Sequence, residues 1–163
     1  MDVKFKKITV DDLELLRNWR MQENITKYML TDPIITKESQ LEWFNKINND
    51  DSRIDYVIVC DDVRIGYYGI TNINYENSSC EIGFYIGDNE YRGKGIFKIV
   101  QKQIEGKIFN DLRLNKIVIN VLENNPIIDA YKRNGFTEDL NLKKQIFKHN
   151  TKYTLLYLYK TKN

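Results

Sequence analysis

One twelve-residue segment, residues 85–96, limits the folds open to this chain more than any other feature. It reads YIGDNEYRGKGI, an apolar strand pattern that passes through a glycine-rich loop. A helix follows at once, because apolar residues recur every four positions: Ile96, Val100, Ile104 and Ile108. A helix N-terminus presents unpaired amides and a partial positive charge, and glycines let an anion approach the backbone. The segment therefore indicates either a plain turn or a phosphate site, with Arg92 and Lys94 nearby.

The spacing of the glycines excludes two common phosphate motifs. A dinucleotide fingerprint needs glycine or another small residue at position 98, where this chain has Lys98. A P-loop needs Gly-Lys followed by serine or threonine, whereas Lys94 is followed by Gly95. Neither motif is present.

The remaining elements follow one another without a linker, a repeat or a low-complexity tract. Strand patterns lie at residues 4–8, 56–60, 64–73, 79–86 and 117–121, then near Phe136 and at 153–159. Helices are predicted after a capping box at Thr9, after a cap at Thr36, from Ile96, and from Pro126 to the stop signal Asn134-Gly135. The order β-α-α-β-β-β-α-β-α-β-β predicts an α+β domain with one mixed sheet.

Length and charge narrow the classes of protein. A chain of 163 residues fits one domain over 1–163, since domains usually contain about 100–200 residues. The 25 basic and 23 acidic side chains nearly cancel, which argues against nucleic acid as a partner. No apolar run approaches the roughly 18–20 residues that span a bilayer, and no signal peptide is evident. We expect a cytoplasmic protein without a membrane partner, and its Ile, Asn and Lys content is typical of bacteria.

Cysteine and histidine offer little chemistry. Cys60 and Cys80 lie twenty positions apart in apolar runs, so we expect reduced core thiols rather than metal ligands. The single histidine, His149, sits in a polar stretch that resembles a hairpin turn. A histidine-based triad or a metal site is therefore not expected.

Two motifs resemble those of the GNAT superfamily of acetyl-CoA-dependent N-acetyltransferases. The family signature R/Q-x-x-G-x-G/A is matched at Arg92 and Gly95, whereas Phe97 replaces the final glycine or alanine. A second pattern, N-x6-Y-x-x-x-G-F, is filled at all four fixed positions: Asn124, Tyr131, Gly135 and Phe136. The resemblance implies a single GNAT-like domain with a mixed, mostly antiparallel sheet of six to seven strands and helices on both faces.

The resemblance also implies where acetyl-CoA binds. The expected contacts are the strand and loop residues Phe84, Tyr85, Ile86, Arg92, Gly93, Lys94, Gly95, Ile96 and Phe97, together with Asn124 and Tyr131. In this family the strand that begins at Glu81 diverges from its neighbour and bonds the pantetheine with its backbone. The loop amides would hold the pyrophosphate.

The reaction needs a proton acceptor and a proton donor. An amine with a pKa near 10 is only about one part in a thousand neutral at pH 7, so a base must assist directly or through water. The resemblance places Tyr131 where its phenol protonates the departing thiolate, although a core aromatic residue is the alternative. Glu81 is the candidate base, with a structural carboxylate that ties adjacent strands as an equal alternative.

The first third of the chain is expected to hold the acceptor amine. The stretches around Trp19, Arg20, Lys27 and Tyr28 resemble the bacterial acetyltransferases of pseudaminic acid synthesis, which act on nucleotide-linked 4-amino sugars. The resemblance implies a UDP-amino sugar, with Arg20 or Lys27 on phosphate and an aromatic ring on the uracil. Most of the aromatic residues here are expected to belong to the core.

Other functions share the same motifs. An N-terminal acetyltransferase for ribosomal proteins would need an open groove, and a polyamine acetyltransferase would need an acidic cleft. A non-catalytic acyl-CoA sensor is the alternative from a different class, against which the tyrosine at position 131 argues. The strand at 153–159 could pair across a homodimer, although Lys160 and Lys162 after it are suited to block such pairing.

Overall fold

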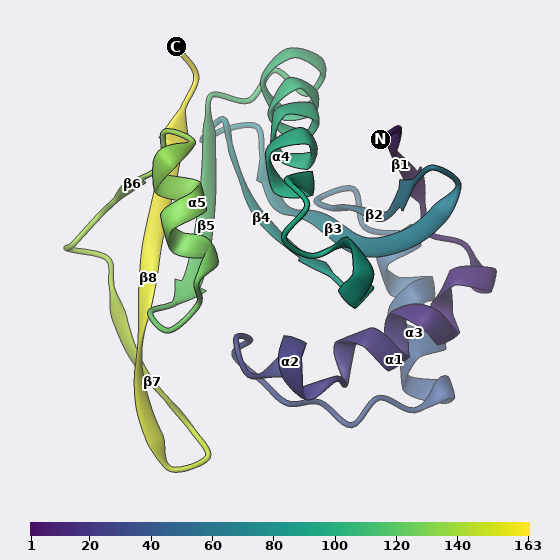
Figure 1. Ribbon diagram of the computed structural model, residues 1–163. Helices are drawn as coiled ribbons and strands as arrows, with labels where there is room; N and C mark the ends of the chain where they lie inside the picture. The colour runs from purple at the N-terminus through teal and green to yellow at the C-terminus, as the bar shows by residue number, and fades with distance from the viewer.

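Eight strands form one sheet in the computed structural model, which describes all residues 1–163 (Figure 1). The strands are β1 (Val3–Lys7), β2 (Ile54–Cys60), β3 (Val63–Asn74), β4 (Ser79–Ile86), β5 (Lys116–Leu122), β6 (Thr137–Glu138), β7 (Lys144–Lys148) and β8 (Thr151–Thr161). The α-helices are α1 (Leu13–Arg20), α2 (Glu23–Thr26), α3 (Lys37–Asn48), α4 (Ile96–Gly106) and α5 (Ile127–Arg133). Short turns of other helix types cover Val10–Asp12, Asn89–Tyr91 and Lys107–Asp111.

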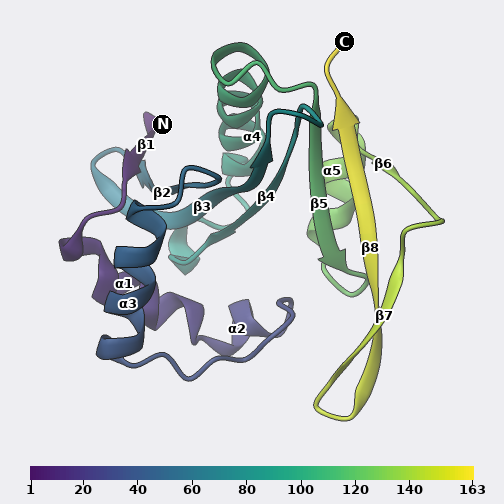
Figure 2. The same ribbon diagram turned by 180° about the vertical axis from the view of Figure 1, so that it is seen from behind.

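The sheet consists of two antiparallel parts joined by one short parallel pair. The strand order is β1-β2-β3-β4-β5-β8-β6, and β7 also pairs with β8. Only β4 and β5 are parallel, and they pair over three residues, from Ser79 opposite Lys116 to Glu81 opposite Val118. Beyond Glu81 the two strands diverge, as Figure 2 shows. An opening between the two parts of the sheet follows from this short pairing.

The helices cover both faces of the sheet and define two cores. In both ribbon views α4 and α5 lie on one face, and α1 and α3 lie on the opposite face beside β2, β3 and β4 (Figures 1 and 2). The side chains of a strand alternate between faces, so Tyr68 enters the larger core with α4 while Tyr67 packs on the smaller core. The smaller core contains residues of α1 and α3, including Leu16 and Phe44.

Local signals in the sequence set the ends of the elements. Thr36 caps α3, since its hydroxyl accepts a bond from the Ser39 amide at 3.0 Å. Gly95 precedes α4 with a φ of 76°, and Gly135 follows α5 with a φ of 93°, in the left-handed region that favours glycine. His149 and Asn150, with φ of 51° and 59°, form the turn between β7 and β8. The predicted caps, helix stop and hairpin turn are thus confirmed.

The α+β class, the mostly antiparallel sheet and the helices on both faces are confirmed. The sheet has eight strands rather than six or seven. Strand β7 was missed because its residues, KQIFK, are mostly polar, and it lies at an edge where only β8 pairs with it. No helix is both long and apolar enough to cross a membrane.

The two cysteines are free thiols buried in the larger core, as predicted. Burial raises the pKa of Cys80 to about 12, and burial together with Asp61 raises the pKa of Cys60. Because the thiolate is the reactive form, both should resist modification at pH 8. We expect Ellman's reagent to detect no thiol in the folded protein within minutes and both thiols in guanidinium chloride. Rapid labelling of the folded protein would contradict this.

Candidate active site

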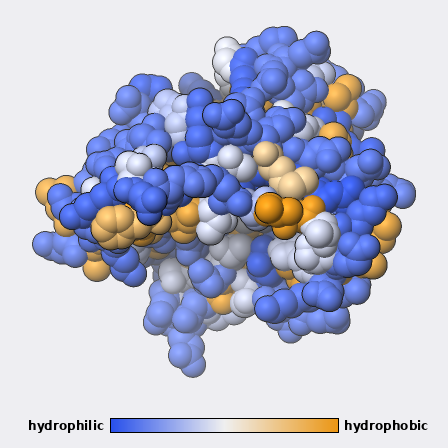
Figure 3. Space-filling view, turned by 90° about the horizontal axis from the view of Figure 1, so that it is seen from below, coloured by the Kyte–Doolittle hydropathy of each residue, from blue (hydrophilic) through white to orange (hydrophobic).

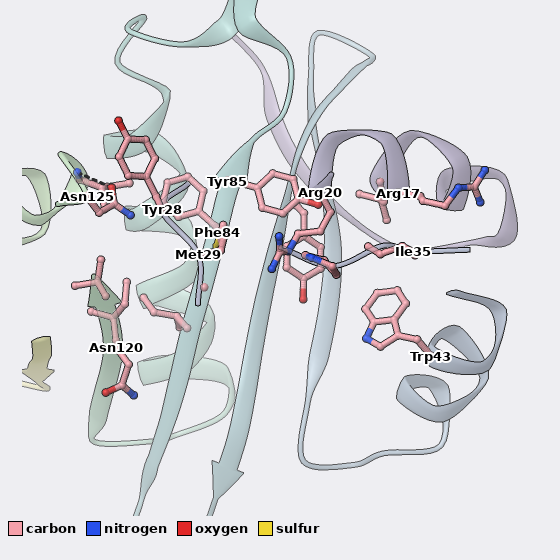
Figure 4. A pocket seen from close by; sticks show the side chains of 18 of the residues that line it. Arg17, Arg20, Tyr28, Met29, Ile35, Trp43, Phe84, Tyr85, Asn120 and Asn125 are labelled. Atoms are coloured by element: carbon pink, nitrogen blue, oxygen red, sulfur yellow. Dashed lines mark hydrogen bonds between the residues drawn. The ribbon is translucent and has the colours of Figure 1, made fainter. Parts of the chain in front are cut away.

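A cavity of about 540 Å³ occupies the opening between the two parts of the sheet. Residues of β4, β5 and α5 line one side, and residues of α1, α3 and the segment between α2 and α3 line the other. Figure 4 shows this arrangement, with Phe84 and Tyr85 of β4 between Asn125 and Trp43. The face seen from below is mostly hydrophilic, with hydrophobic side chains gathered in separate patches (Figure 3). The cavity is therefore lined by both parts of the sheet and by the helices α1, α3 and α5.

The glycine loop before α4 is open and its amides are free. A methyl group at Gly93 or Gly95 would meet no atom within 4 Å, and both residues have positive φ. The amides of Gly93, Lys94 and Gly95 donate no backbone hydrogen bond. Free amides at the start of an eleven-residue helix suit an anion such as a pyrophosphate. This geometry favours the phosphate site over the plain turn.

The side chains of the loop differ in their contacts and in their exposure to solvent. The guanidinium of Arg92 donates to the Ile86 carbonyl at 3.0 and 2.7 Å, so it ties the loop to the end of β4. Lys94 is exposed and lies 5.8 Å from the centre of the Tyr91 ring. Ile96 is buried in the larger core, so only its backbone is available to a ligand.

Tyr131 of α5 is fully buried yet belongs to the cavity lining. Its hydroxyl lies near that of Tyr68, which donates to Gln101, but the two make no hydrogen bond of good geometry. Burial, with a smaller contribution from Glu105, raises the pKa of this phenol well above its ordinary range. The group is thus a protonated, unpaired donor beside the cavity. A protonated phenol is what the predicted proton donor requires, and that role of Tyr131 stays a prediction.

Phe97 stands where the family signature has glycine or alanine, and its ring packs among other aromatic residues. Its ring packs edge-on against Tyr131, with 5.0 Å between centroids, and also contacts Phe84 at 5.7 Å. Phe136 contacts the other side of Tyr131 at 5.0 Å. The larger side chain therefore fills core space and fixes the orientation of the Tyr131 ring.

Glu81 lies where β4 and β5 are still paired and is outside the cavity lining. Its carboxylate accepts one bond from Asn72 of β3 at 2.9 Å and another from Asn120 of β5 at 3.0 Å. Both oxygens are thus engaged by neighbouring strands. This arrangement favours the structural alternative for Glu81 over the role of general base.

The structure places Asn124 in an exposed turn, while the adjacent Asn125 lines the cavity. The Asn125 side chain accepts a bond from the Ile127 amide at 3.0 Å and so begins α5. The motif indicated Asn124, but the residue that lines the cavity is its neighbour Asn125.

Of the four residues expected to hold the acceptor, two reach the cavity. Arg20 and Tyr28 line it, whereas Lys27 is exposed outside it. Trp19 is only 5% exposed and is absent from the lining. A Cβ atom at Gly87 would lie 2.1 Å from its indole, so Trp19 packs directly on that backbone. Trp19 is a core residue, because glycine at position 87 leaves room for the ring.

Residues 2–137 match the family of acetyltransferase (GNAT) domains. This chain belongs to that family. It is 28% identical over 134 residues to the acetyltransferase PseH of Campylobacter jejuni subsp. jejuni serotype O:23/36 (strain 81-176), over 82% of each chain. It is 25% identical over 146 residues to the spermidine N(1)-acetyltransferase of Escherichia coli (strain K12), over 89% of this chain and 78% of the other.

A solved structure extends the likeness to the whole fold. Spermidine N-acetyltransferase from Vibrio cholerae, in complex with CoA and spermine, superposes with a TM-score of 0.90 at 24% identity. The match covers 98% of this chain and 95% of the other. The GNAT enzyme described here is an acetyl-CoA-dependent N-acetyltransferase.

The residues of this GNAT domain fit acetyl-CoA. Phe84 and Tyr85 of the divergent end of β4 belong to the cavity lining together with Tyr131, whereas the open glycine loop lies outside that lining. Acetyl-CoA supplies an acetyl group activated as a thioester. The chain contributes amides for the pyrophosphate, an exposed strand edge and a protonated phenol.

Several lining residues of the GNAT domain were not singled out from the sequence. They are Arg17, Arg53, Tyr67, Asn120 and Asn125. Helical periodicity offered a signal for one of them, since Arg17 lies three residues before Arg20 and shares its face of α1. Arg53 and Tyr67 carried no such signal, because they meet only through Asp55, which bonds both.

Proposed function

We propose that this enzyme transfers acetyl to the 4-amino group of a nucleotide-linked amino-deoxy sugar, carried on UDP. The observation that carries the proposal is the charge of the acceptor side of the cavity. Arg20 lies there with one guanidinium nitrogen buried and unpartnered, and none of the 23 lining residues is an Asp or Glu. A buried cationic nitrogen without a partner suits the phosphate oxygens of a diphosphate.

The other arginines of the lining are already paired. Arg17 donates to Gln40 at 3.1 Å, and Arg53 forms two bonds with Asp55 at 2.8 and 2.7 Å. Arg20 bonds the protein only through its Nη2, which donates to the carbonyl and the hydroxyl of Thr31 at 3.2 and 3.3 Å. Burial lowers the pKa of Arg20, but a guanidinium remains charged in proteins. Its Nη1 is left for the acceptor.

Aromatic and apolar surfaces complete the acceptor side. Trp43, Tyr28 and Tyr85 line the cavity and offer faces for the uracil ring, while Met29 and Ile35 suit the deoxy and methyl positions of the sugar. Figure 4 places Arg20 beside Tyr85 and between Tyr28 and Trp43. The resemblance to the enzymes of pseudaminic acid synthesis, and the relatives named PseH, support the same substrate.

In the proposed reaction the neutral amine attacks the thioester carbonyl directly. The C–N bond forms, the C–S bond breaks, and Tyr131 gives its proton to the departing thiolate. The proton that the amine loses passes through water in the cavity and restores the Tyr131 phenol, so amine and thioester become amide and free thiol with the enzyme unchanged. The bond from Asn120 to Glu81 supports a mechanism in which Glu81 holds the cavity wall and takes no part in this proton transfer.

A polyamine is the second candidate acceptor. The relatives named spermidine acetyltransferases, and the spermine-bound structure with the same fold, favour it. A polyamine carries several positive charges, however, and the lining presents arginine and no carboxylate to it. An N-terminal peptide acceptor and an acyl-CoA sensor without turnover are the remaining alternatives.

The proposal is tested by the release of free CoA from acetyl-CoA with three acceptors. We expect kcat/KM for a UDP-linked 4-amino-4,6-dideoxy sugar to exceed that for spermidine or an N-terminal peptide at least 100-fold. Faster turnover of spermidine would replace the sugar by a polyamine, and faster turnover of the peptide would replace it by a protein substrate. No turnover of any of the three would favour the sensor.

A further inference from the structure

Lys148, the last residue of β7, has a buried charge although it belongs to a projecting hairpin. Its side chain is 7% exposed, and all three ammonium hydrogens have acceptors. They meet the carbonyl of Thr26 at 2.5 Å, the carbonyl of Met29 at 2.9 Å and the Asp32 carboxylate at 2.8 Å. His149 contacts the other oxygen of Asp32. A buried ammonium is tolerated only when it is fully paired in this way, so the contact is more than a surface ion pair.

The segment that Lys148 holds is a wall of the acceptor side. Five residues between α2 and α3 line the cavity: Tyr28, Met29, Pro33, Ile34 and Ile35. Residues 30–35 take part in no backbone–backbone hydrogen bond. Their position therefore depends on contacts with side chains, among them Lys148 on Asp32, Arg20 on Thr31 and Met21 on the Ile35 amide.

The same contact joins the two parts of the sheet at their open end. Within the sheet these parts are connected only through the three paired residues of β4 and β5. The β7–β8 hairpin belongs to the part with β5, because β8 pairs with β5 along its length. The segment 27–35 follows α2 and belongs to the other part. Figure 1 shows the hairpin extending past the end of β5 on the side of α2.

We propose that Lys148 is a positioning residue that sets the width of the acceptor end of the cavity. It does so by tying the C-terminal hairpin to the segment 27–35, and through Thr31 next to Asp32 it also fixes Arg20. The proposal rests on the proposed function in taking this end as the acceptor side. Acetyl-CoA is expected at the glycine loop, and the contacts of Lys148 are with Thr26, Met29 and Asp32 instead.

Lys148→Met tests the proposal, with Lys148→Arg as the conservative variant and Lys152→Met as a control on an exposed lysine of the same hairpin. We expect Lys148→Met to raise the acceptor KM at least tenfold while the acetyl-CoA KM stays within twofold. Lys148→Arg should recover part of the loss, and Lys152→Met should have no effect. Equal changes in both KM values, or no change, would overturn the positioning role.

A second measurement needs no acceptor. Its result therefore remains valid if the proposed substrate is wrong. Within the segment 27–35, amide hydrogen exchange should accelerate at least tenfold in Lys148→Met at residues 27–29, whose amides donate to the carbonyls of Glu23, Ile25 and Thr26, while exchange in α4 stays unchanged. Asp32→Asn, which keeps the shape of the side chain, should accelerate exchange at the same residues to a smaller degree. Unchanged exchange at residues 27–29 would overturn the proposal, whichever acceptor the enzyme uses, and a general acceleration would indicate loss of folding instead of positioning.

Discussion

Tyr131→Phe is expected to lower kcat about 100-fold, because a general acid typically contributes a factor of 10²–10⁴ to the rate. The acetyl-CoA dissociation constant should stay within about threefold, since the ring remains. Its edge contacts with Phe97 and Phe136, each at 5.0 Å between centroids, do not involve the hydroxyl. Stability should not fall either, because the lost hydroxyl has no hydrogen-bond partner.

The measurement is steady-state release of CoA with binding of acetyl-CoA by calorimetry. Tyr159→Phe is the matched control, since this tyrosine of β8 lies outside the cavity lining. Because the pKa of Tyr131 is raised well above its usual value, the phenol stays protonated up to at least pH 10. No decline of the rate between pH 8 and 10 should therefore arise from this group. Turnover of Tyr131→Phe within twofold of the natural enzyme would remove Tyr131 from the mechanism.

The half of the site near the glycine loop was largely predictable from the sequence. The loop, the start of α4 and the stop after α5 each depend on residues close together in the chain, such as Gly95 and Gly135. Such signals act through local backbone conformation. The conformation of the loop was therefore predictable without knowledge of the tertiary structure, and the phosphate site there stays a prediction.

The acceptor side was predicted only in part, because it depends on contacts between distant residues. Trp19 was expected in the site, yet the absence of a side chain at Gly87 lets it pack in the smaller core. Strand β7 is polar, and its pairing with β8 depends on the hairpin turn at His149 and Asn150. No sequence pattern links Lys148 to Thr26, Met29 and Asp32, more than a hundred residues earlier.

The two parts of the site meet at the point where β4 and β5 diverge. Glu81 stands at that point and bonds Asn72 and Asn120 on the strands at either side. Its carboxylate therefore stabilises the end of the short parallel pair from which the cavity opens. The same divergence leaves the end of β4 without a partner in β5, and the cavity lies there.

Arg20→Met is expected to raise the KM for a UDP-linked amino sugar about 10- to 100-fold, the equivalent of one charge-assisted hydrogen bond of about 1.5–3 kcal/mol. The acetyl-CoA KM should change little, because Arg20 lies on the acceptor side of the cavity. Arg17→Met is the matched control on the same face of α1, since its guanidinium is already bound by Gln40 at 3.1 Å.

The same pair of variants separates the two candidate acceptors. Removal of the Arg20 charge weakens attraction for a diphosphate, whereas it relieves repulsion of a polyamine. Turnover of the UDP sugar should therefore fall in Arg20→Met while any turnover of spermidine stays level or rises. The expected loss for the sugar should also shrink in high salt, since screening weakens the interaction in the natural enzyme. A sugar KM that is the same in Arg20→Met and Arg17→Met would show that the diphosphate does not bind at Arg20.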